Sequence, residues 1–373
     1  MNYEIPVLPL AVDLESKAVL RQLNLANKKL AELKGVAQTI PNEDILINTL
    51  TLQEAKDSSA VENIVTTHDE IYKAELDIKQ YAISASTKEV INYSHALKRG
   101  FELVRNNKLL TNTMIKEIQR SLENNSAGFR TLPGTNLKDQ FGAVVYTPPQ
   151  EKMLIERQMQ NLETFINDDS ISDLDPLIKM AIVHHQFESI HPFYDGNGRT
   201  GRIINILYLV IKGLLDLPIL YLSRYIIRNK SQYYHAIQAV RDRGEWETWV
   251  LFMLKGVEST ADETIGLVKE ISRLMIEYKH KMRSLPGRVY RHELLNNLFN
   301  HPYTKIEFIR ADLDVNRITA TKYLNILAEA KLVEKVKHGR TNYYLNMPLI
   351  RLLMNVSAGD VVAPDINIES ISV

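Results

Sequence analysis

A glycine-rich segment at residues 191–202 constrains the fold of this chain more than any other feature. It reads HPFYDGNGRTGR, and an apolar run that opens at Ile203 follows it directly. Gly196 and Gly198 flank Asn197, and glycine leaves the backbone free to turn with its N–H groups on one side, as in phosphate-binding loops. The apolar run predicts that this loop leads into the N-terminus of a buried helix, an end that favours anions. The sequence therefore predicts an anion-binding turn at the start of a core helix.

Helical periodicity dominates the chain before residue 283. The apolar spacing predicts helices over about 14–33, 42–51, 88–105 and 111–122, and a further helix that carries Ser58. The most apolar stretch, 203–222, contains Lys212, Asp216 and Pro218, which favours a buried helix and loop over a membrane span. Residues 138–147, closed by two prolines, predict a short β-hairpin because Val144 and Tyr146 alternate and prolines end a strand. We expect a mainly α fold, a helical bundle with one hairpin.

The last part of the chain has a different pattern. A Ser-Leu-Pro-Gly hinge at 284–287 is followed by helical patterns near 304–309 and 316–327 and by strand patterns at 332–337 and 341–345. That order predicts a winged helix. Residues 288–340 contain ten Lys or Arg and six Asp or Glu. The cations that could contact phosphates are Arg317, Lys322, Lys337 and Arg340. DNA binding through 288–345 and protein docking both remain open.

These boundaries predict four regions, at 1–110, 111–283, 284–350 and 351–373, with the last as a tail. The chain has 45 Lys and Arg and 45 Asp and Glu, so no global field draws it to nucleic acid or membrane. It has no cysteine, which excludes disulfides and cysteine zinc sites and fits a reducing cytoplasm. The N-terminal residues lack the pattern of a signal peptide. We therefore expect a cytoplasmic protein.

The segment at 191–202 resembles the signature of the Fic family, His-x-Phe-x-Asp/Glu-Gly-Asn-Gly-Arg-x-x-Arg, and matches it at every fixed position. The similarity extends over about 40–265, with further likeness at 176–190 and 220–223. Fic proteins typically transfer AMP from ATP to a hydroxyl side chain of a target protein. The resemblance therefore implies a protein adenylyltransferase with a Fic-type helical core, for which ATP is a substrate and Mg²⁺ a cofactor.

The resemblance assigns roles that physical chemistry can support. A Ser, Thr or Tyr hydroxyl is a weak nucleophile until a neighbour takes its proton, and His191 is the expected general base. Asp195 is the hard oxygen ligand for Mg²⁺ between phosphates. Backbone amides would stabilise charge on the α-phosphate, and the arginines offer forked donors. The expected ATP-binding residues are Gly196, Asn197, Gly198, Arg199, Thr200, Gly201, Arg202 and Tyr233.

A second motif lies far upstream, at residues 58–63. Ser58, Glu62 and Asn63 match the Ser/Thr-x-x-x-Glu-Gly/Asn pattern of the inhibitory helix of autoinhibited Fic proteins, expected here at about 57–70. In that family the glutamate pairs with the second arginine of the signature, here Arg202. Ser59 and Glu62 also match a capping box, in which each side chain satisfies an amide at a helix start. Both interpretations remain open at this stage.

Three further assignments concern the target, the nucleotide and a metal. Fic proteins have a flap that pairs by backbone with the modified segment, which the resemblance places at Val144, Val145 and Tyr146. A tyrosine beside the nucleotide corresponds to Tyr233, while we expect its neighbour Tyr234 in the core. His184 and His185 are adjacent on a helix and point about 100° apart, so we expect one inside, one in solvent and no shared metal.

Two other functions compete with AMP transfer. Some Fic proteins use the inhibitory glutamate to align a water that removes AMP, so Glu62 could serve de-AMPylation. A transcription regulator could instead sense a nucleotide in the Fic core and act through the winged helix. An intact His191 argues against a core that only binds. The expected partners are a target protein with a hydroxyl side chain, the chain itself as acceptor, a second copy in a homodimer, and DNA.

Overall fold

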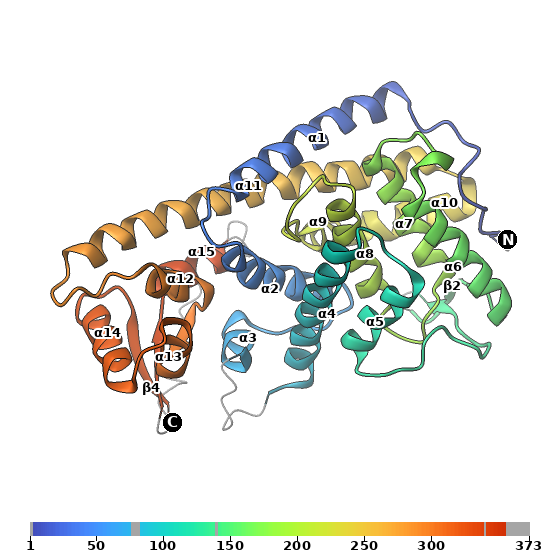
Figure 1. Cartoon of the computed structure of the whole chain (residues 1–373). Coiled ribbons are helices and arrows are strands. Elements are labelled where there is room, and N and C mark those ends of the chain that lie inside the picture. The colour runs from blue at the N-terminus through green and yellow to red at the C-terminus, as the bar shows by residue number, and fades with distance from the viewer. Residues whose placement is uncertain (1–2, 76–82, 139–140, 339–340, 356–373) are drawn as a thin grey trace.

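The computed structural model describes residues 3–75, 83–138, 141–338 and 341–355. These residues form a mainly helical molecule with two small antiparallel sheets (Figure 1). The expected α fold is therefore confirmed. The predicted tail at 351–373 lies mostly outside the described residues, which end at Asn355.

Two long helices, α1 (Lys17–Ala37) and α11 (Trp246–Ser284), lie side by side along one edge of the molecule (Figure 1). α1 begins at Ser16, whose hydroxyl accepts a hydrogen bond from the Val19 amide. Its buried residues recur three or four positions apart, which is the stripe of an amphipathic helix: Val19, Leu23, Ala26, Leu30 and Leu33. These two helices form a long edge against which the rest of the bundle packs.

The centre of the bundle is formed by α7 (Pro176–Ile190) and α8 (Asn197–Ile211), which pack on each other. Both are buried on nearly every side, so the buried helix predicted after the glycine-rich segment is confirmed. The helices around them are α3 (His68–Glu75), α4 (Ala85–Asn107), α5 (Asn112–Glu123), α6 (Lys152–Asn167), α9 (Leu222–Arg228) and α10 (Lys230–Arg243), with a short 3-10 turn, η1 (Asp169–Ile171). The turn at 191–196 thus connects two core helices.

The helix α2 (Glu43–Val61) differs from the sequence prediction in a way that matters for function. Asn42 caps its start by accepting from the Asp44 amide, and the helix then continues to Val61. The predicted helix at 42–51 and the separate Ser58 helix are therefore one element. Glu62 is the residue that ends it. The capping-box interpretation of Ser59 and Glu62 is wrong, because that motif belongs to a helix start.

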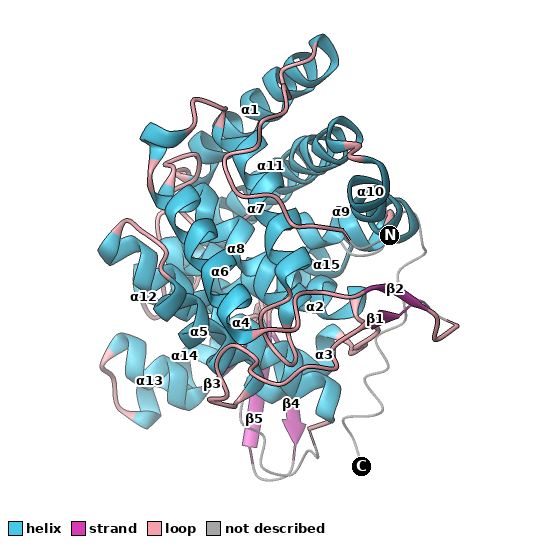
Figure 2. Ribbon diagram, turned by 90° about the vertical axis from the view of Figure 1, so that its right-hand side faces the viewer, coloured by secondary structure: helices cyan, strands magenta, loops and turns pink. Residues whose placement is uncertain are grey.

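The predicted hairpin is present as β1 (Leu137–Lys138) and β2 (Val144–Tyr146), which pair antiparallel at the edge of the molecule (Figure 2). Leu137 lies opposite Tyr146, and Lys138 opposite Val144. The hairpin closes through Gly142, whose φ of +83° lies in the region that glycine tolerates best. Residues 139–140 lie outside the described part of the chain.

The C-terminal elements follow the order expected of a winged helix. They are α12 (His292–Asn300), β3 (Tyr303–Lys305), α13 (Ile306–Leu313), α14 (Arg317–Glu329), β4 (Glu334–His338), β5 (Thr341–Leu345) and α15 (Met347–Asn355). The three strands form one antiparallel sheet in the order β3-β5-β4. We refer to residues 288–355 as the C-terminal module. Arg340, one of the predicted phosphate contacts, lies outside the described residues.

The C-terminal module is packed against the rest of the chain rather than held apart by the hinge. Tyr278 of α11 is buried, and its hydroxyl lies 2.6 Å from the Leu332 carbonyl oxygen. Asn300 of α12 accepts a hydrogen bond of 2.9 Å from Asn48 of α2. Figure 1 shows α2 between the module and the catalytic helices. The helix that ends at Glu62 therefore contacts the module near its other end.

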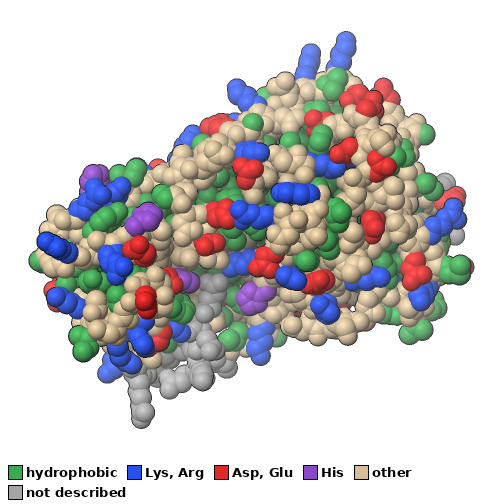
Figure 3. Space-filling model, viewed as in Figure 1, with side chains coloured by type: hydrophobic (Ala, Val, Ile, Leu, Met, Phe, Trp, Pro, Cys, Tyr) green, Lys and Arg blue, Asp and Glu red, His purple; other side chains and the backbone are tan. Residues whose placement is uncertain are grey.

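Charged side chains of both signs are interspersed over the face shown in Figure 3. This distribution agrees with the equal numbers of acidic and basic residues in the chain. None of the helices in the described part of the chain combines the length and apolar content that a membrane span requires.

Candidate active site

The signature segment forms a tight turn between α7 and α8. His191 ends α7 with a φ of 49° and a ψ of 58°, and its amide donates to the Phe187 carbonyl. Gly196 precedes α8 with a φ of 75°. The Asn197 side chain closes the turn, because its Oδ1 accepts from the Phe193 amide and its Nδ2 donates to the Phe193 carbonyl, both at 2.8 Å. The side chain of Asn197 thus shapes the loop that its own backbone belongs to.

The three glycines of the signature make room for carboxylates. A Cβ built at Gly196 would overlap the Glu123 carboxylate, one at Gly198 would overlap that of Glu62, and one at Gly201 would overlap that of Glu188. A glycine at each position therefore lets an acidic side chain approach the backbone closely. Only Gly196 also needs its positive φ.

The second signature arginine, Arg202, is buried and is held by the end of α2. Its Nη2 lies 2.7 Å from Glu62 Oε1 and 3.0 Å from the Ser58 carbonyl oxygen, and its Nε donates to Ser58 Oγ at 2.7 Å. Burial alone would lower the pKa of Arg202, but the Glu62 carboxylate reverses this effect and holds the pKa above its ordinary value. The structure therefore brings the two predicted motifs together, although they are 140 positions apart.

Asn63, which follows Glu62, has a backbone conformation that favours glycine or asparagine. Its φ is 65°, in the left-handed region where helices commonly end at glycine or asparagine. Its Oδ1 also accepts from Lys230 Nζ at 3.0 Å. Asn63 therefore turns the chain sharply after Glu62. The Glu62 side chain, at the C-terminal end of α2, faces the signature turn.

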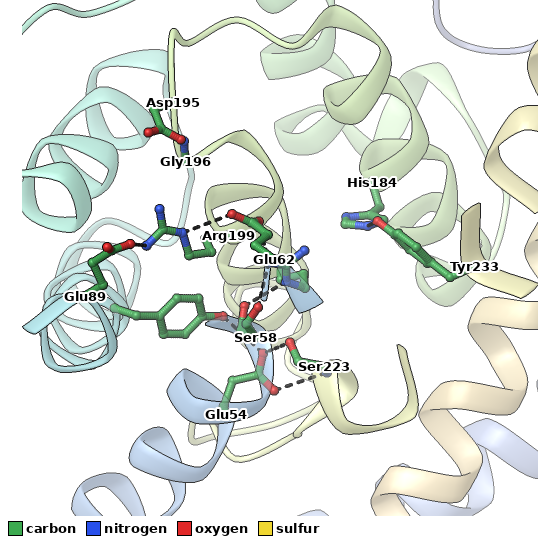
Figure 4. Close-up of polar contacts among 12 residues, drawn as sticks. Glu54, Ser58, Glu62, Glu89, His184, Asp195, Gly196, Arg199, Ser223 and Tyr233 are labelled. Carbon is green, nitrogen blue, oxygen red and sulfur yellow. Dashed lines mark hydrogen bonds and ion pairs between the residues drawn. The ribbon is translucent and has the colours of Figure 1, made fainter. Parts of the chain in front are cut away.

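The first signature arginine, Arg199, pairs with three carboxylates. Its Nε lies 3.3 Å from Glu62 and its Nη1 3.0 Å from Glu89 (Figure 4). Its Nη2 lies 2.9 Å from Glu123. Glu89 lies on α4 and Glu123 on α5. Burial raises the pKa of the Glu123 carboxyl, and the Arg199 charge opposes that rise. Sequence reasoning missed both glutamates, because neither belongs to a motif.

His191 and Asp195 lie on the two sides of the turn. Burial, together with the nearby charges of Arg130 and Arg241, lowers the pKa of His191 to about 3, so the imidazole is neutral and can accept a proton at pH 7. The Asp195 side chain is exposed, and its Oδ1 accepts from the Gly196 amide at 2.7 Å. Among the described residues no group of three or more metal-ligating side chains is present, so a metal here would rely on Asp195 and the substrate.

Comparison with known proteins supports the resemblance. The model of the Fic/DOC family matches residues 109–209, and that of the Fic/DOC family N-terminal region matches 20–102. The model described as protein adenylyltransferase SoFic-like, C-terminal domain, matches 274–349. The three models cover separate stretches that together span well over half of the chain. The chain belongs to the Fic/DOC family.

Several relatives of this Fic protein are named as adenylyltransferases. It is 29% identical over 129 residues to protein adenylyltransferase fic-1 of Caenorhabditis elegans, which covers 34% of this chain and 23% of that protein. It is 28% identical over 201 residues to a probable protein adenylyltransferase of Aquifex aeolicus, covering 52% of this chain and 57% of that protein. The chain therefore spans less than two thirds of the length of these relatives.

Solved structures confirm the fold. A Fic family protein from Desulfovibrio desulfuricans aligns with a TM-score of 0.58 and 18% identity, over 90% of this chain and 97% of that one. Fic-1 from Caenorhabditis elegans aligns with a TM-score of 0.52 and 20% identity, over 67% of this chain and 73% of that one. The arrangement of helices seen here is thus that of known Fic structures.

Three aromatic predictions for this Fic protein need correction. Tyr233 is buried, with its hydroxyl 2.8 Å from His184 Nε2, while Tyr234 is 49% exposed (Figure 4 shows the His184–Tyr233 pair). The ring that solvent can reach is therefore that of Tyr234 and not that of Tyr233, because the side of α10 that carries Tyr233 packs against the core. The expectation that one of His184 and His185 meets solvent is also wrong. Both are fully buried, since helices pack around α7 on nearly every side.

The motif at residues 58–63 is anchored one helical turn earlier by Glu54, which is buried. Its Oε1 accepts from the Ser223 hydroxyl and, at 3.1 Å, from that of Tyr93, and its Oε2 accepts from the Ser223 amide at 3.2 Å (Figure 4). Burial raises the pKa of Glu54 to about 8. Asp57 adds an ion pair of 3.1 Å with Arg224. These contacts fix α2 against the start of α9, so Glu62 is delivered from a firmly held helix.

The flap of this Fic protein presents part of its predicted surface to solvent. Val144 and Val145 are 54% and 45% exposed, whereas Tyr146 is buried. The Tyr146 hydroxyl donates to the Ser189 carbonyl at 2.8 Å, and its ring lies under the Arg241 guanidinium. Tyr146 therefore anchors the hairpin to α7, which leaves Val144 and Val145 as the residues of β2 that face solvent. Thr200, predicted to bind ATP, is fully buried on α8.

Proposed function

We propose that this chain is an autoinhibited protein adenylyltransferase, which transfers AMP from ATP to a Ser, Thr or Tyr hydroxyl of a protein and releases pyrophosphate. The observation that supports this most strongly is the pairing of Glu62 with both signature arginines, beside a turn that carries a neutral histidine. A turn that only connects two helices would need neither the histidine nor the buried arginines. The relatives named protein adenylyltransferase support the same activity.

The transfer step follows from the positions of the side chains. The target hydroxyl loses its proton to His191 as its oxygen forms a bond to the α-phosphorus. The bond from that phosphorus to the bridging oxygen breaks, and pyrophosphate leaves. The first amides of α8 lack partners within the helix and can stabilise the charge on the phosphate oxygens. Freed from Glu62, Arg202 would bind the γ-phosphate.

Inhibition follows from competition for the arginines. Glu62 places a carboxylate where the terminal phosphate would pair with Arg202, and a buried guanidinium cannot satisfy both anions in one geometry. The carboxylate also brings negative charge to the mouth of an anion-binding turn. ATP could then bind only in a pose that misplaces its α-phosphate.

Mg²⁺ belongs to the proposal, held by Asp195 and the phosphates of ATP, where it would neutralise charge on the leaving pyrophosphate. Asp195 fits this role because it is exposed beside the anion-binding turn and offers hard oxygen ligands. A magnesium ion bound by one carboxylate and substrate phosphates is a common arrangement.

Asp195→Ala is expected to raise the Mg²⁺ concentration for half-maximal transfer at least about tenfold, because it removes the only protein ligand in the turn. The measurement is a Mg²⁺ titration of AMP transfer at saturating ATP. Asp173→Ala, at an exposed aspartate outside this site, is the control and should titrate like the parent. An unchanged metal profile in Asp195→Ala would mean that this carboxylate has another role.

For partners, we propose a protein that presents a hydroxyl side chain, with self-modification as an alternative and a second copy of the chain as a homodimer partner. We also propose that the protein is cytoplasmic, because a chain without cysteine suits a reducing compartment.

We propose a second activity, nucleic-acid binding, for the C-terminal module as a winged helix. Arg317, Ile318 and Lys322 are exposed near the start of α14, the helix that would enter a groove, and Lys337 is exposed on β4. Ile318 is 81% exposed, which is high for an apolar residue of this size.

The logarithm of the affinity for a mixed-sequence DNA duplex is expected to fall linearly with the logarithm of the salt concentration. Lys322→Ala should reduce the magnitude of that slope by about 0.9, because one phosphate contact is lost. Fluorescence anisotropy at several salt concentrations measures this. Arg273→Ala, at an exposed arginine of α11, is the control. Affinity that does not change with salt would instead indicate protein docking.

A further inference from the structure

Arg130 is a buried cation that the chemistry described so far does not use. It lies between α5 and β1, and its residue is 0% exposed. Within the described part of the chain it forms no ion pair with a carboxylate, which is unusual because a buried charge without a partner is costly. Its guanidinium donates instead to backbone carbonyls.

The carbonyls that Arg130 contacts belong to two functional segments. Nε donates to the His191 carbonyl at 2.8 Å, and Nη2 donates to that of Ile190 at 3.3 Å. Nη2 also donates to the carbonyl of Pro149, just after the strand β2 of the flap. One planar side chain thus joins the turn of the general base to the base of the hairpin that faces the target.

The residues around Arg130 run alongside the signature. The Arg130 amide donates to the Pro192 carbonyl at 2.8 Å, and the ring of Phe129 lies 5.2 Å from that of Phe193. The Tyr194 hydroxyl accepts from the amides of residues 131 and 132. Four consecutive residues therefore support four consecutive residues of the catalytic turn, which fixes Arg130 relative to His191.

His191 needs such support because of its backbone. A φ of 49° is uncommon for a residue other than glycine, and such a conformation persists only where surrounding contacts determine it. The direction of the imidazole depends on that backbone. The hydrogen bond from Arg130 to the His191 carbonyl constrains the same peptide unit.

We propose that Arg130 is a positioning residue for AMP transfer, whose guanidinium fixes the His191 turn to the base of the flap, so that the general base and the target segment share one geometry. This inference rests on the proposed adenylyltransferase function. Among the described residues Arg130 is the one that donates to the Pro149 carbonyl, so the signature itself does not supply this link.

Arg130→Lys and Arg130→Gln separate geometry from charge. Lysine keeps the charge but lacks the planar fork that reaches several carbonyls, so kcat is expected to fall about 10²-fold, as for a misplaced catalytic group. The KM for ATP should change less than about threefold, because Arg130 does not contact the phosphate-binding residues. Glutamine removes the charge as well as the fork.

A pH profile gives a readout that a purely structural role would not change. The charges of Arg130 and Arg241 both lower the pKa of His191. Without the Arg130 charge that pKa rises, so His191 becomes protonated at higher pH and loses its capacity to accept a proton. The acidic limb of kcat is therefore expected to move to higher pH in Arg130→Gln and to stay in place in Arg130→Lys.

The experiment uses the full chain in the Glu62→Gly background, with ATP labelled at the α-phosphate and one fixed cell lysate as the source of acceptor proteins. Arg120→Lys, the same change at an exposed arginine of α5, is the control and should match the background. Nucleotide binding is measured in parallel to show that each variant is folded.

The expected result is a loss of kcat of about 10²-fold in Arg130→Lys and a shift of the acidic limb of the kcat–pH profile to higher pH in Arg130→Gln. A kcat in Arg130→Lys within twofold of the background, or a limb that does not move in Arg130→Gln, would overturn the inference. If only Arg130→Lys folds, its kcat decides. Absence of any transfer in the Glu62→Gly background itself would count against the proposed function and not against the role of Arg130.

Discussion

Replacing Glu62 with glycine is expected to raise AMP transfer roughly 5- to 150-fold, the range that corresponds to a coupling of about 1–3 kcal/mol. The substitution removes the carboxylate 2.7 Å from Arg202, so that this arginine can bind the γ-phosphate. Glycine is tolerated at helix ends, so α2 itself should persist, but loss of the carboxylate beside the buried Arg202 should lower the stability of the protein without ATP. The measurement is incorporation of label from ATP at fixed Mg²⁺.

Two further variants test the reason for that gain. Arg202→Ala added to Glu62→Gly should remove the increase, since the freed arginine is then absent. Glu43→Gly is the matched control, because it makes the same change at the other end of α2, where Glu43 pairs with the exposed Arg105. Activity of Glu62→Gly at or below the parent, in a folded protein, would contradict the inhibitory role. A selective loss of AMP removal from a modified protein would instead support the reverse reaction.

The gain from Glu62→Gly has a limit that the structure sets. Arg199 loses one of its three carboxylates but keeps Glu89 at 3.0 Å and Glu123 at 2.9 Å. Glu123 is 12% exposed and lies against Gly196, inside the turn that would receive the phosphates. The charge that opposes ATP is therefore reduced and not abolished by the single substitution.

Loss of His191 is expected to reduce AMP transfer by about 10²- to 10⁴-fold, the usual contribution of a general base. His191→Asn is the sharper variant, because asparagine tolerates the left-handed backbone of this position better than alanine does. His191→Ala and His191→Asn are both made in the Glu62→Gly background, where the rate is high enough to follow the loss. Binding of ATP should persist, since residues 196–202 are unchanged.

His235→Ala provides the control for His191, because His235 is exposed on α10. It should transfer AMP at the rate of the background. Transfer above a tenth of the background in both His191 variants, with normal thermal unfolding, would show that another group accepts the proton.

The proximity of the signature side chains could be predicted from the sequence, because it is local. His191, Asp195 and the two arginines lie within residues 191–202, so their proximity needs no knowledge of the fold. The pairing of Glu62 with Arg202 was also predicted, although only through the resemblance. The hairpin and the buried helix after the turn follow from period-2 and apolar patterns.

Features that depend on packing between distant helices were missed. Glu89, Glu123 and Arg130 contact the site from α4, α5 and the segment after it, and each is an ordinary charged residue in its own sequence context. The pattern Ser-x-x-Glu can occur at the end of a helix as well as at its start. The continuous helix α2 shows that here it stands at the end and is not a capping box. Which of Tyr233 and Tyr234 is buried could not be predicted without knowing which face of α10 packs against the core.

The position of α2 has a thermodynamic consequence. One end of this helix supplies Glu62 to the arginines, its middle is fixed by Glu54, and its first half contacts Asn300 of the C-terminal module. A ligand of the module that favours a displaced α2 would strengthen ATP binding. Because such linkage is reciprocal, ATP would strengthen the binding of that ligand by the same factor. The concentration of ATP in the cell would then regulate the affinity of the module for its ligand, in addition to supplying the substrate of the reaction.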